Sequence, residues 1–152
     1  MPTPCATDRI QVFGDNTDHV AGYHDARPGL NVATLRLDVA AGNIANALSD
    51  GPLPDAVNAG NFPAAYSPLR VNQTDVIGGG TSATVSAVSP ATVPVYDPNA
   101  PFADSHGMVA SPNIDLAGEL VQALIARYSF AANAQIIRAD AQMSAALLNI
   151  LA

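Results

Sequence analysis

The pattern of apolar and polar positions is clearest in the last quarter of the chain, residues 113–152. No proline interrupts it, and apolar residues recur every three or four positions, which is the spacing of one side of an α-helix. Alanine, leucine, isoleucine, glutamine, arginine and methionine dominate, and these residues form helices readily. Asn113 is a candidate N-cap, with Asp115 near the positive end of the helix dipole. We therefore predict a helix over 113–152, in which about 38 helical residues span about 57 Å.

This predicted helix carries two adjacent apolar rows. The first row comprises Leu120, Ala123, Phe130, Ala134, Ile137, Ala141, Leu148 and Leu151. The second row comprises Val121, Ile125, Tyr128, Ala132, Ile136, Ala139, Met143, Ala146 and Ile150. Two adjacent rows make a face too wide for one partner helix, so we expect a single chain to leave part of it exposed. Charged residues divide the run, so no window reaches the ~18 apolar residues of a membrane span.

A second, shorter helix is predicted over residues 30–50. Its apolar stripe consists of Leu30, Ala33, Leu37, Ala40, Ile44 and Ala47. Pro28 and Gly29 precede the stripe, and a Ser-Asp-Gly-Pro sequence ends it. We expect the two helices to bury their stripes on each other as an antiparallel coiled coil. Residues 1–29 are polar and rich in proline and glycine, and we expect an irregular or mobile N-terminal arm.

Residues 51–112 are predicted to form a loop and β-hairpin region. Residues 81–88 alternate between small apolar and hydroxyl side chains, residues 67–77 alternate more loosely, and glycines 78–80 separate them. This pattern is typical of two strands joined by a tight turn. Pro90, Pro94, Pro98 and Pro101 then favour an extended, non-helical connection over residues 89–112. The predicted class is α+β, with two long terminal helices, a small β-hairpin and a proline-rich middle segment.

Composition narrows the possible functions. The formal net charge is −7, there is no lysine, and the six basic residues are scattered arginines. An acidic chain without a basic patch argues against a nucleic-acid or anionic-membrane partner. The first residues lack the basic and apolar regions of a secretory signal peptide. We therefore expect no membrane insertion and no export by that route.

Candidate chemistry is sparse. Asp97, Asp104 and His106 offer metal ligands, but their spacing fits neither a calcium loop nor a zinc site, and turn formation explains the aspartates better. The glycines at 78–80 lack the Lys-Ser/Thr ending of a phosphate loop. Three further possible ligands in the arm have no recognised spacing: Cys5, His19 and His24. We predict no catalytic, cofactor or metal site, with a small metal-dependent enzyme as a rival hypothesis.

Two segments together resemble the bacterial flagellar axial proteins of the rod and hook. Residues 30–46, with the core LRLDVAAGNIANAL, resemble the N-terminal rod motif, which ends in Asn-Asn-Ile-Ala-Asn where this chain has Gly-Asn-Ile-Ala-Asn. Six short segments near the end of the chain resemble the C-terminal motif of the family. They are Ser111-Pro-Asn-Ile-Asp115, Glu119-Leu-Val121, Tyr128-Ser-Phe130, Ala132-Asn133-Ala134, Asp140-Ala-Gln-Met143 and Leu147-Leu148-Asn149. The short length and the linker at residues 95–113 are most similar to proximal-rod members, whereas the ending resembles distal-rod or hook relatives. Residues 1–29 depart from the family pattern.

The resemblance implies a structural subunit of the flagellar basal-body rod, not an enzyme. Its terminal helices would self-assemble into a tubular axial structure, being poorly ordered before docking. The implied partners are copies of the chain and other flagellar rod and hook proteins. The implied route is the flagellar type III export apparatus, without a cleaved signal peptide, to the periplasmic rod of the basal body. The alternative is a non-catalytic helical adaptor that binds a partner through the long C-terminal helix.

Within this interpretation we expect the assembly contacts on seven apolar residues: Leu37, Ile44, Leu120, Leu124, Ile137, Leu147 and Leu148. Three asparagines are carried over from the motifs: Asn43, Asn46 and Asn133. We expect them to form hydrogen bonds at helix ends or between helices and so to fix the register. The alternative is that they are merely exposed.

Overall fold

The computed structural model describes residues 18–56, 59–77 and 79–150. The elements in chain order are α1 (Asp18–Ala45), a short 3-10 helix η1 (Ala59–Asn61), β1 (Leu69–Asp75), β2 (Thr81–Ala87), β3 (Thr92–Tyr96), β4 (Met108–Pro112) and α2 (Leu116–Ile150). The strands form two separate two-stranded antiparallel sheets. This arrangement confirms the predicted α+β class.

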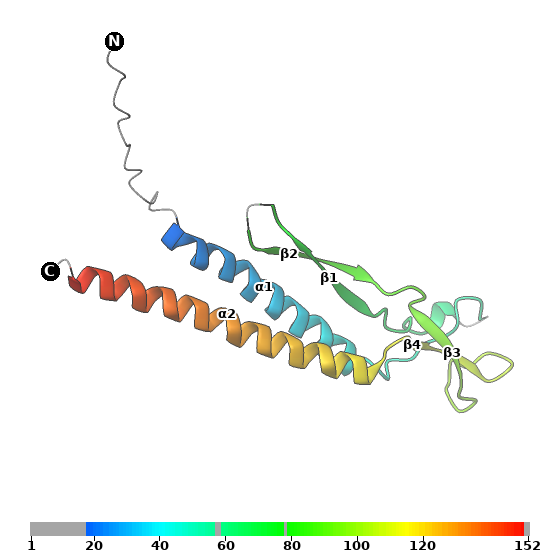
Figure 1. The fold of residues 1–152 in the computed structure, drawn as a ribbon. Helices are drawn as coiled ribbons and strands as arrows, with labels where there is room; N and C mark the ends of the chain where they lie inside the picture. Colours follow the sequence, from blue (N-terminus) through cyan, green and yellow to red (C-terminus); the bar gives the residue numbers. More distant parts are fainter. Residues whose placement is uncertain (1–17, 57–58, 78, 151–152) are drawn as a thin grey trace, which may run out of the picture.

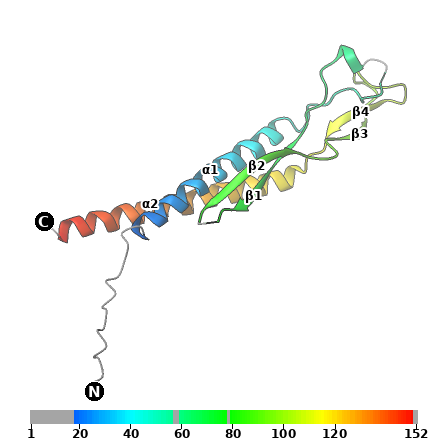
Figure 2. The same cartoon turned by 90° about the horizontal axis from the view of Figure 1, so that it is seen from above.

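The two helices lie side by side and antiparallel, as Figures 1 and 2 show. At ~1.5 Å per residue, the 35 residues of α2 span about 52 Å and the 28 residues of α1 about 42 Å. The C-terminal end of α2 therefore extends beyond the start of α1. The β1–β2 hairpin packs on α1, and the β3–β4 sheet lies past the other end of the pair, where α1 ends and α2 begins (Figure 1). The described part of the chain contains no helix suited to crossing a membrane.

Helix α1 begins at Asp18 and not at the predicted residue 30, so much of the expected arm is helical. The prediction stopped at Pro28 because proline lacks an N–H and removes one helical hydrogen bond. Here the helix continues through Pro28, because residues on both sides of it, Ala26 and Ala33 among them, are buried. The remaining arm, with Cys5, lies outside the described residues, as do the side chains of His19 and His24.

The other helix boundaries also differ from the prediction. Helix α1 ends at Ala45, five residues before the expected end, and helix α2 starts at Leu116, three residues after the expected start. The side chain of Asn113, the expected N-cap, instead donates from Nδ2 to the carbonyl oxygen of Pro90 at 2.9 Å. Asn113 therefore secures the connection between the β3 region and α2.

The predicted hairpin is confirmed in β1 and β2, which pair from Leu69 opposite Ala87 to Asp75 opposite Thr81. Its turn contains Gly79 and Gly80 at φ of 107° and 81°. These angles lie in the region that glycine adopts without steric cost. The glycine run therefore gives the chain the reversal that the two strands require.

A second strand pair was not foreseen in the proline-rich connection. β3 and β4 pair antiparallel, and Pro94 lies opposite Ala110. Proline is tolerated there because β3 is an edge strand, where a missing N–H breaks no ladder bond. On the other side of β4, Gly51 and Ala110 exchange two backbone hydrogen bonds of 3.0 and 2.9 Å.

The core is built from small side chains. Within the described ranges, the buried hydrophobic residues are Ala26, Val32, Ala33, Ala40, Val109, Ala110 and Ala126. No leucine, isoleucine or phenylalanine whose side chain is described is buried. The chain therefore folds by close approach of small residues and keeps its larger apolar side chains nearer the surface.

Candidate assembly surface on the helix pair

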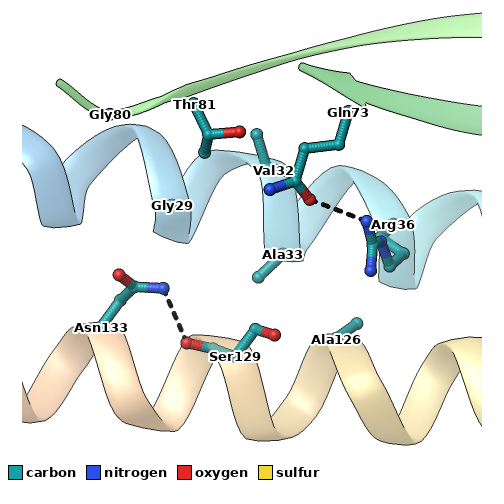
Figure 3. Close-up of a pocket in the computed structure, with 10 residues that line it drawn as sticks. All are labelled: Gly29, Val32, Ala33, Arg36, Gln73, Gly80, Thr81, Ala126, Ser129 and Asn133. Atoms are coloured by element: carbon teal, nitrogen blue, oxygen red, sulfur yellow. Dashed lines mark hydrogen bonds between the residues drawn. The ribbon is translucent and has the colours of Figure 1, made fainter. Parts of the chain in front are cut away.

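The face of α2 that meets α1 carries small and polar side chains. Ala126, Ser129 and Asn133 face Gly29 and Ala33 of α1 (Figure 3). Ala126 is 1 % exposed. The two backbones approach closely because little side-chain volume separates them.

Gly29 marks a close approach between the helices. A Cβ atom at this position would lie 2.7 Å from the side-chain amide of Asn133, well inside van der Waals contact. The Nδ2 of Asn133 donates to the carbonyl oxygen of Ser129, one turn earlier in the same helix, at 2.8 Å. Asn133 is therefore held along its own helix and packs over Gly29.

A pocket of about 250 Å³ lies between the helix pair and the β1–β2 hairpin (Figure 3). It is lined by Gly29, Val32, Ala33, Arg36, Gln73, Gly80, Thr81, Ala126, Ser129 and Asn133. At its edge, Arg36 Nη2 donates to Gln73 Oε1 at 2.8 Å. This bond joins the hairpin to α1.

Asn43 is the polar centre of the fold and is 0 % exposed. Its Nδ2 donates to Glu119 Oε1 at 2.8 Å and to the Leu69 carbonyl oxygen at 2.7 Å. Its Oδ1 accepts from the Leu69 N–H and from the Tyr66 hydroxyl, both at 3.1 Å. Two donors and two acceptors exhaust the capacity of an asparagine amide. One side chain therefore connects α1, α2 and the start of β1.

Asn46 acts at the end of α1. Its Nδ2 donates to the Gly42 carbonyl oxygen at 2.9 Å, and its Oδ1 accepts from the Ser49 hydroxyl at 3.2 Å. The Gly42 carbonyl oxygen also accepts from the backbone N–H of Asn46 at 3.1 Å, so Asn46 closes the last turn of α1 with both its backbone and its side chain. All three motif asparagines thus have hydrogen-bonding partners within the chain.

A different side of α2, about a quarter turn around the helix from Ala126, Ser129 and Asn133, is apolar and exposed. We call the second apolar row, Val121, Ile125, Tyr128, Ala132, Ile136, Ala139, Met143, Ala146 and Ile150, the outer row; all nine residues are exposed. Exposure of its large side chains ranges from 40 % at Ile125 to 79 % at Ile150. The outer row contains no charged residue. It forms a continuous apolar strip along almost the whole helix.

The first apolar row is divided. Ala123, Ala134 and Ile137 are half-buried, whereas Leu120, Phe130, Ala141 and Leu148 are exposed. We expected the helices to bury their stripes on each other, and the residues that are buried or half-buried are mainly the small ones. Of the stripe predicted on α1, Ala33 and Ala40 are buried but Leu37 is exposed. Small residues allow a shorter distance between helices, and this leaves the large residues pointing away.

The seven predicted assembly residues do not gather into one cluster. Five are exposed: Leu37, Leu120, Leu124, Leu147 and Leu148. Ile44 and Ile137 are half-buried. All ten residues of α2 from 141 to 150 are exposed, so the end of the helix lies uncovered on every side.

Sequence reasoning missed Gly29, Tyr66 and the contact between Glu119 and Asn43. A signal for the helix contact was present: small or polar residues follow 3-4 spacing on α1 at Ala26, Gly29, Ala33, Arg36, Ala40 and Asn43. No comparable signal points to Tyr66, which lies in an irregular loop.

The aspartates considered as metal ligands close turns instead. Asp104 Oδ1 accepts from the N–H groups of Met108 and His106, each at 2.8 Å, and Asp97 Oδ1 accepts from the Asn99 N–H at 3.1 Å. The Met108 N–H does most to hold the pKa of Asp104 below its ordinary value of 3.8; desolvation opposes this, and the His106 N–H and ring charge add to it. In the part of the chain that the structure describes, no three histidine, cysteine or acidic residues are grouped to hold a metal ion.

Comparison with known proteins places these features in a family. Residues 105–150 match the family described as "Flagellar basal body rod FlgEFG protein C-terminal". The flagellar basal-body rod protein FlgC of Agrobacterium fabrum is 31 % identical over 129 residues, a match that covers 83 % of this chain and 90 % of the relative. The FlgC proteins of Salmonella typhimurium and Escherichia coli are 32 % and 34 % identical, each match covering 74 % of this chain and 82 % of the relative. The chain therefore belongs to the family of the flagellar basal-body rod protein FlgC.

Proposed function

We propose that this chain is a structural subunit of the flagellar basal-body rod and that the outer row of α2 is its main assembly surface. The observation that carries the proposal is the exposure of that row from Val121 to Ile150. The outer row runs over thirty residues of helix, which corresponds to a length of about 44 Å. A continuous exposed apolar strip of this kind marks a surface that another protein covers.

The physical driving force is the removal of apolar surface from water. Covering such surface stabilises a complex by about 25 cal/mol per Å². Leu120, Leu124, Leu147 and Leu148 add exposed apolar area on α2, and Leu37 adds area on α1. We assign all five to contacts with neighbouring subunits.

We infer that the helix pair itself is a short antiparallel coiled coil with small residues at its seam. The 3-4 spacing of Ala26, Gly29, Ala33 and Ala40 supports this, because the same spacing keeps a seam in register in coiled coils. Ile44 and Ile137 border the seam. Asn43, Asn46 and Asn133 hold the subunit in shape, which leaves the large apolar residues for assembly.

The named relatives are basal-body rod proteins, and on that basis we assign copies of the chain and other rod components as partners. Contacts between different surfaces of successive subunits build an extended structure where they do not close into a ring. Export through the flagellar type III apparatus and a place in the periplasmic rod belong to the same proposal. A core of alanine and valine supports such export, because little apolar burial opposes unfolding. The exposed row would equally suit a helical adaptor, but the FlgC relatives favour the rod subunit.

The test compares two neighbouring positions on α2. Ile136→Glu places a charge in the outer row, whereas Gln135→Glu places the same charge on an exposed polar position beside it. Sedimentation velocity over a concentration series, with far-UV circular dichroism on the same samples, measures association and helix content. We expect Ile136→Glu to abolish association at concentrations where the wild type and Gln135→Glu associate.

The dilute Ile136→Glu monomer should keep the helix content of the dilute wild type, because the substituted side chain is exposed in the folded chain. Equal association of both variants would contradict the assignment of the outer row. Any gain of helix with association in the wild type would show that the terminal helices order as they dock.

A further inference from the structure

The tip of the β1–β2 hairpin presents an isoleucine to solvent. Ile77 is fully exposed, and Val76 beside it is about half exposed. The glycines that follow add no side chain around Ile77, so nothing in the described turn shields it. A fully exposed isoleucine on a narrow projection has the shape of a knob that inserts into a partner.

The same chain contains an apolar pocket of about 220 Å³ near β4. Its lining is Pro52, Pro54, Ala64, Ala65, Thr92 and Ala110, which includes no charged residue. A cavity of about 150 Å³ accommodates a benzene molecule. The pocket is therefore large enough for one isoleucine side chain.

The knob and the pocket lie at opposite ends of the β region. β1 has seven residues, which separate its two ends by about 20 Å at ~3.3 Å per residue. Ile77 follows the last residue of β1, whereas Ala64 and Ala65 precede the first. In Figure 1 the hairpin tip points back along α1, away from β3 and β4. Ile77 therefore cannot fill the pocket of its own chain.

We propose that Ile77 of one copy inserts into the pocket between Pro52, Ala64 and Ala110 of a second copy. The proposal rests on the assembly function above and names a second contact for it. Because each copy offers a knob at one end and a pocket at the other, the contact is heterologous and repeats from copy to copy. In this proposal the β1–β2 hairpin contributes a contact between copies that is separate from the contacts of the helices.

The test is chemical cross-linking between copies. In a Cys5→Ser background, Val76→Cys and Ala64→Cys place thiols beside the knob and at the rim of the pocket, both at partly or fully exposed positions. A short bis-maleimide reagent is added at concentrations where sedimentation shows association. We expect a ladder of dimers, trimers and longer products, because each chain carries both partners of the link.

The matched control adds Ile77→Ser to the same double-cysteine chain and should abolish the ladder. Without cysteines, Ile77→Ser should weaken association about tenfold or more, the loss expected for one buried isoleucine. Val85→Ser, at an exposed valine of β2 away from the tip, should leave it unchanged. A ladder that persists with Ile77→Ser would overturn the proposal.

The outcomes separate this contact from the outer row. Association without any ladder overturns the knob contact and leaves the outer-row assignment intact. A wild-type chain that stays monomeric at every concentration overturns both. A Val76→Cys chain that cross-links to a cysteine-bearing second rod subunit, while no link forms between copies, identifies that subunit as the occupant and contradicts a contact between copies.

Discussion

Helix α2 has one face of small and polar side chains and another of large apolar side chains. The face towards α1 presents Ala126, Ser129 and Asn133, whereas the outer row presents large residues such as Ile125 and Tyr128. Both faces belong to one helix, so composition and helix propensity do not explain the difference. What differs is the size of the side chains. Small side chains permit a second helix to pack closely, whereas large side chains would hold it further away. The comparison supports our proposal that folding uses the small face and that assembly uses the large one.

This division has an energetic consequence. Burying one large aliphatic side chain contributes about 1.5–3 kcal/mol, and the outer row realises little of this in a single chain. The monomer therefore depends on the close contact between helices and on the hydrogen bonds around Asn43. Substitutions on the two faces should separate stability from association.

The largest effect is expected at Asn43. Asn43→Leu leaves the Tyr66 hydroxyl and both backbone groups of Leu69 without their partner, so we expect unfolding to become easier by about 3 kcal/mol. Urea unfolding of the dilute monomer, followed by circular dichroism, measures this. Asn46→Ala loses two bonds at a less buried helix end and should cost about 1 kcal/mol. Equal losses would contradict the central role of Asn43.

An intermediate effect is expected from one substitution made on each face. Ala126→Leu forces extra volume between α1 and α2 and should destabilise the monomer by about 1–3 kcal/mol. Ala132→Leu enlarges the outer row at an exposed position and should change monomer stability by no more than about 0.5 kcal/mol. It should also tighten association. Urea unfolding and sedimentation of both variants measure the two quantities, and equal destabilisation would remove the distinction between the faces.

The smallest effect is expected at the loop end, far from both faces. The pKa of Asp104 is lowered in the folded chain by the bonds from Met108 and His106, so the folded state favours the carboxylate. Its contribution to stability is present above the ordinary pKa of 3.8 and is lost as pH falls through the lower folded value. We expect the amide protons of His106 and Met108 to lose their protection, measured against the intrinsic exchange rate at each pH, only below about pH 4. Asp104→Asn should remove this pH dependence without changing association.

The sequence predicts the elements whose periodicity is long and regular. The apolar rows predict helix α2, and the alternation on both sides of the glycine turn predicts the hairpin of β1 and β2. The start of α1 escapes prediction because Pro28 normally ends a helix, while tertiary packing on both sides of it carries the helix through. The β3–β4 pair escapes because proline argues against strands, yet Pro94 occupies an edge strand where no N–H is needed.

The sequence predicts which residues are candidates for the assembly surface, but it does not predict which of them face α1 and which face solvent. The sequence shows two apolar rows and the three motif asparagines. Periodicity treats Ala126 and Ile125 alike as apolar, so it cannot show that the alanine faces α1 and the isoleucine faces solvent. Likewise, the motif identifies Asn43, but its bonds to Tyr66 and Glu119 join segments distant in sequence.

The most direct measurement places a fluorescent reporter in the outer row. The chain has no tryptophan, so Tyr128→Trp, at a residue that is 69 % exposed, supplies a single reporter. Emission is recorded over a concentration series, with sedimentation velocity on the same samples. We predict the emission of a water-exposed indole in the dilute monomer and a shift to shorter wavelength in step with association. Association with unchanged emission would contradict the account, because the chain would then assemble through another surface.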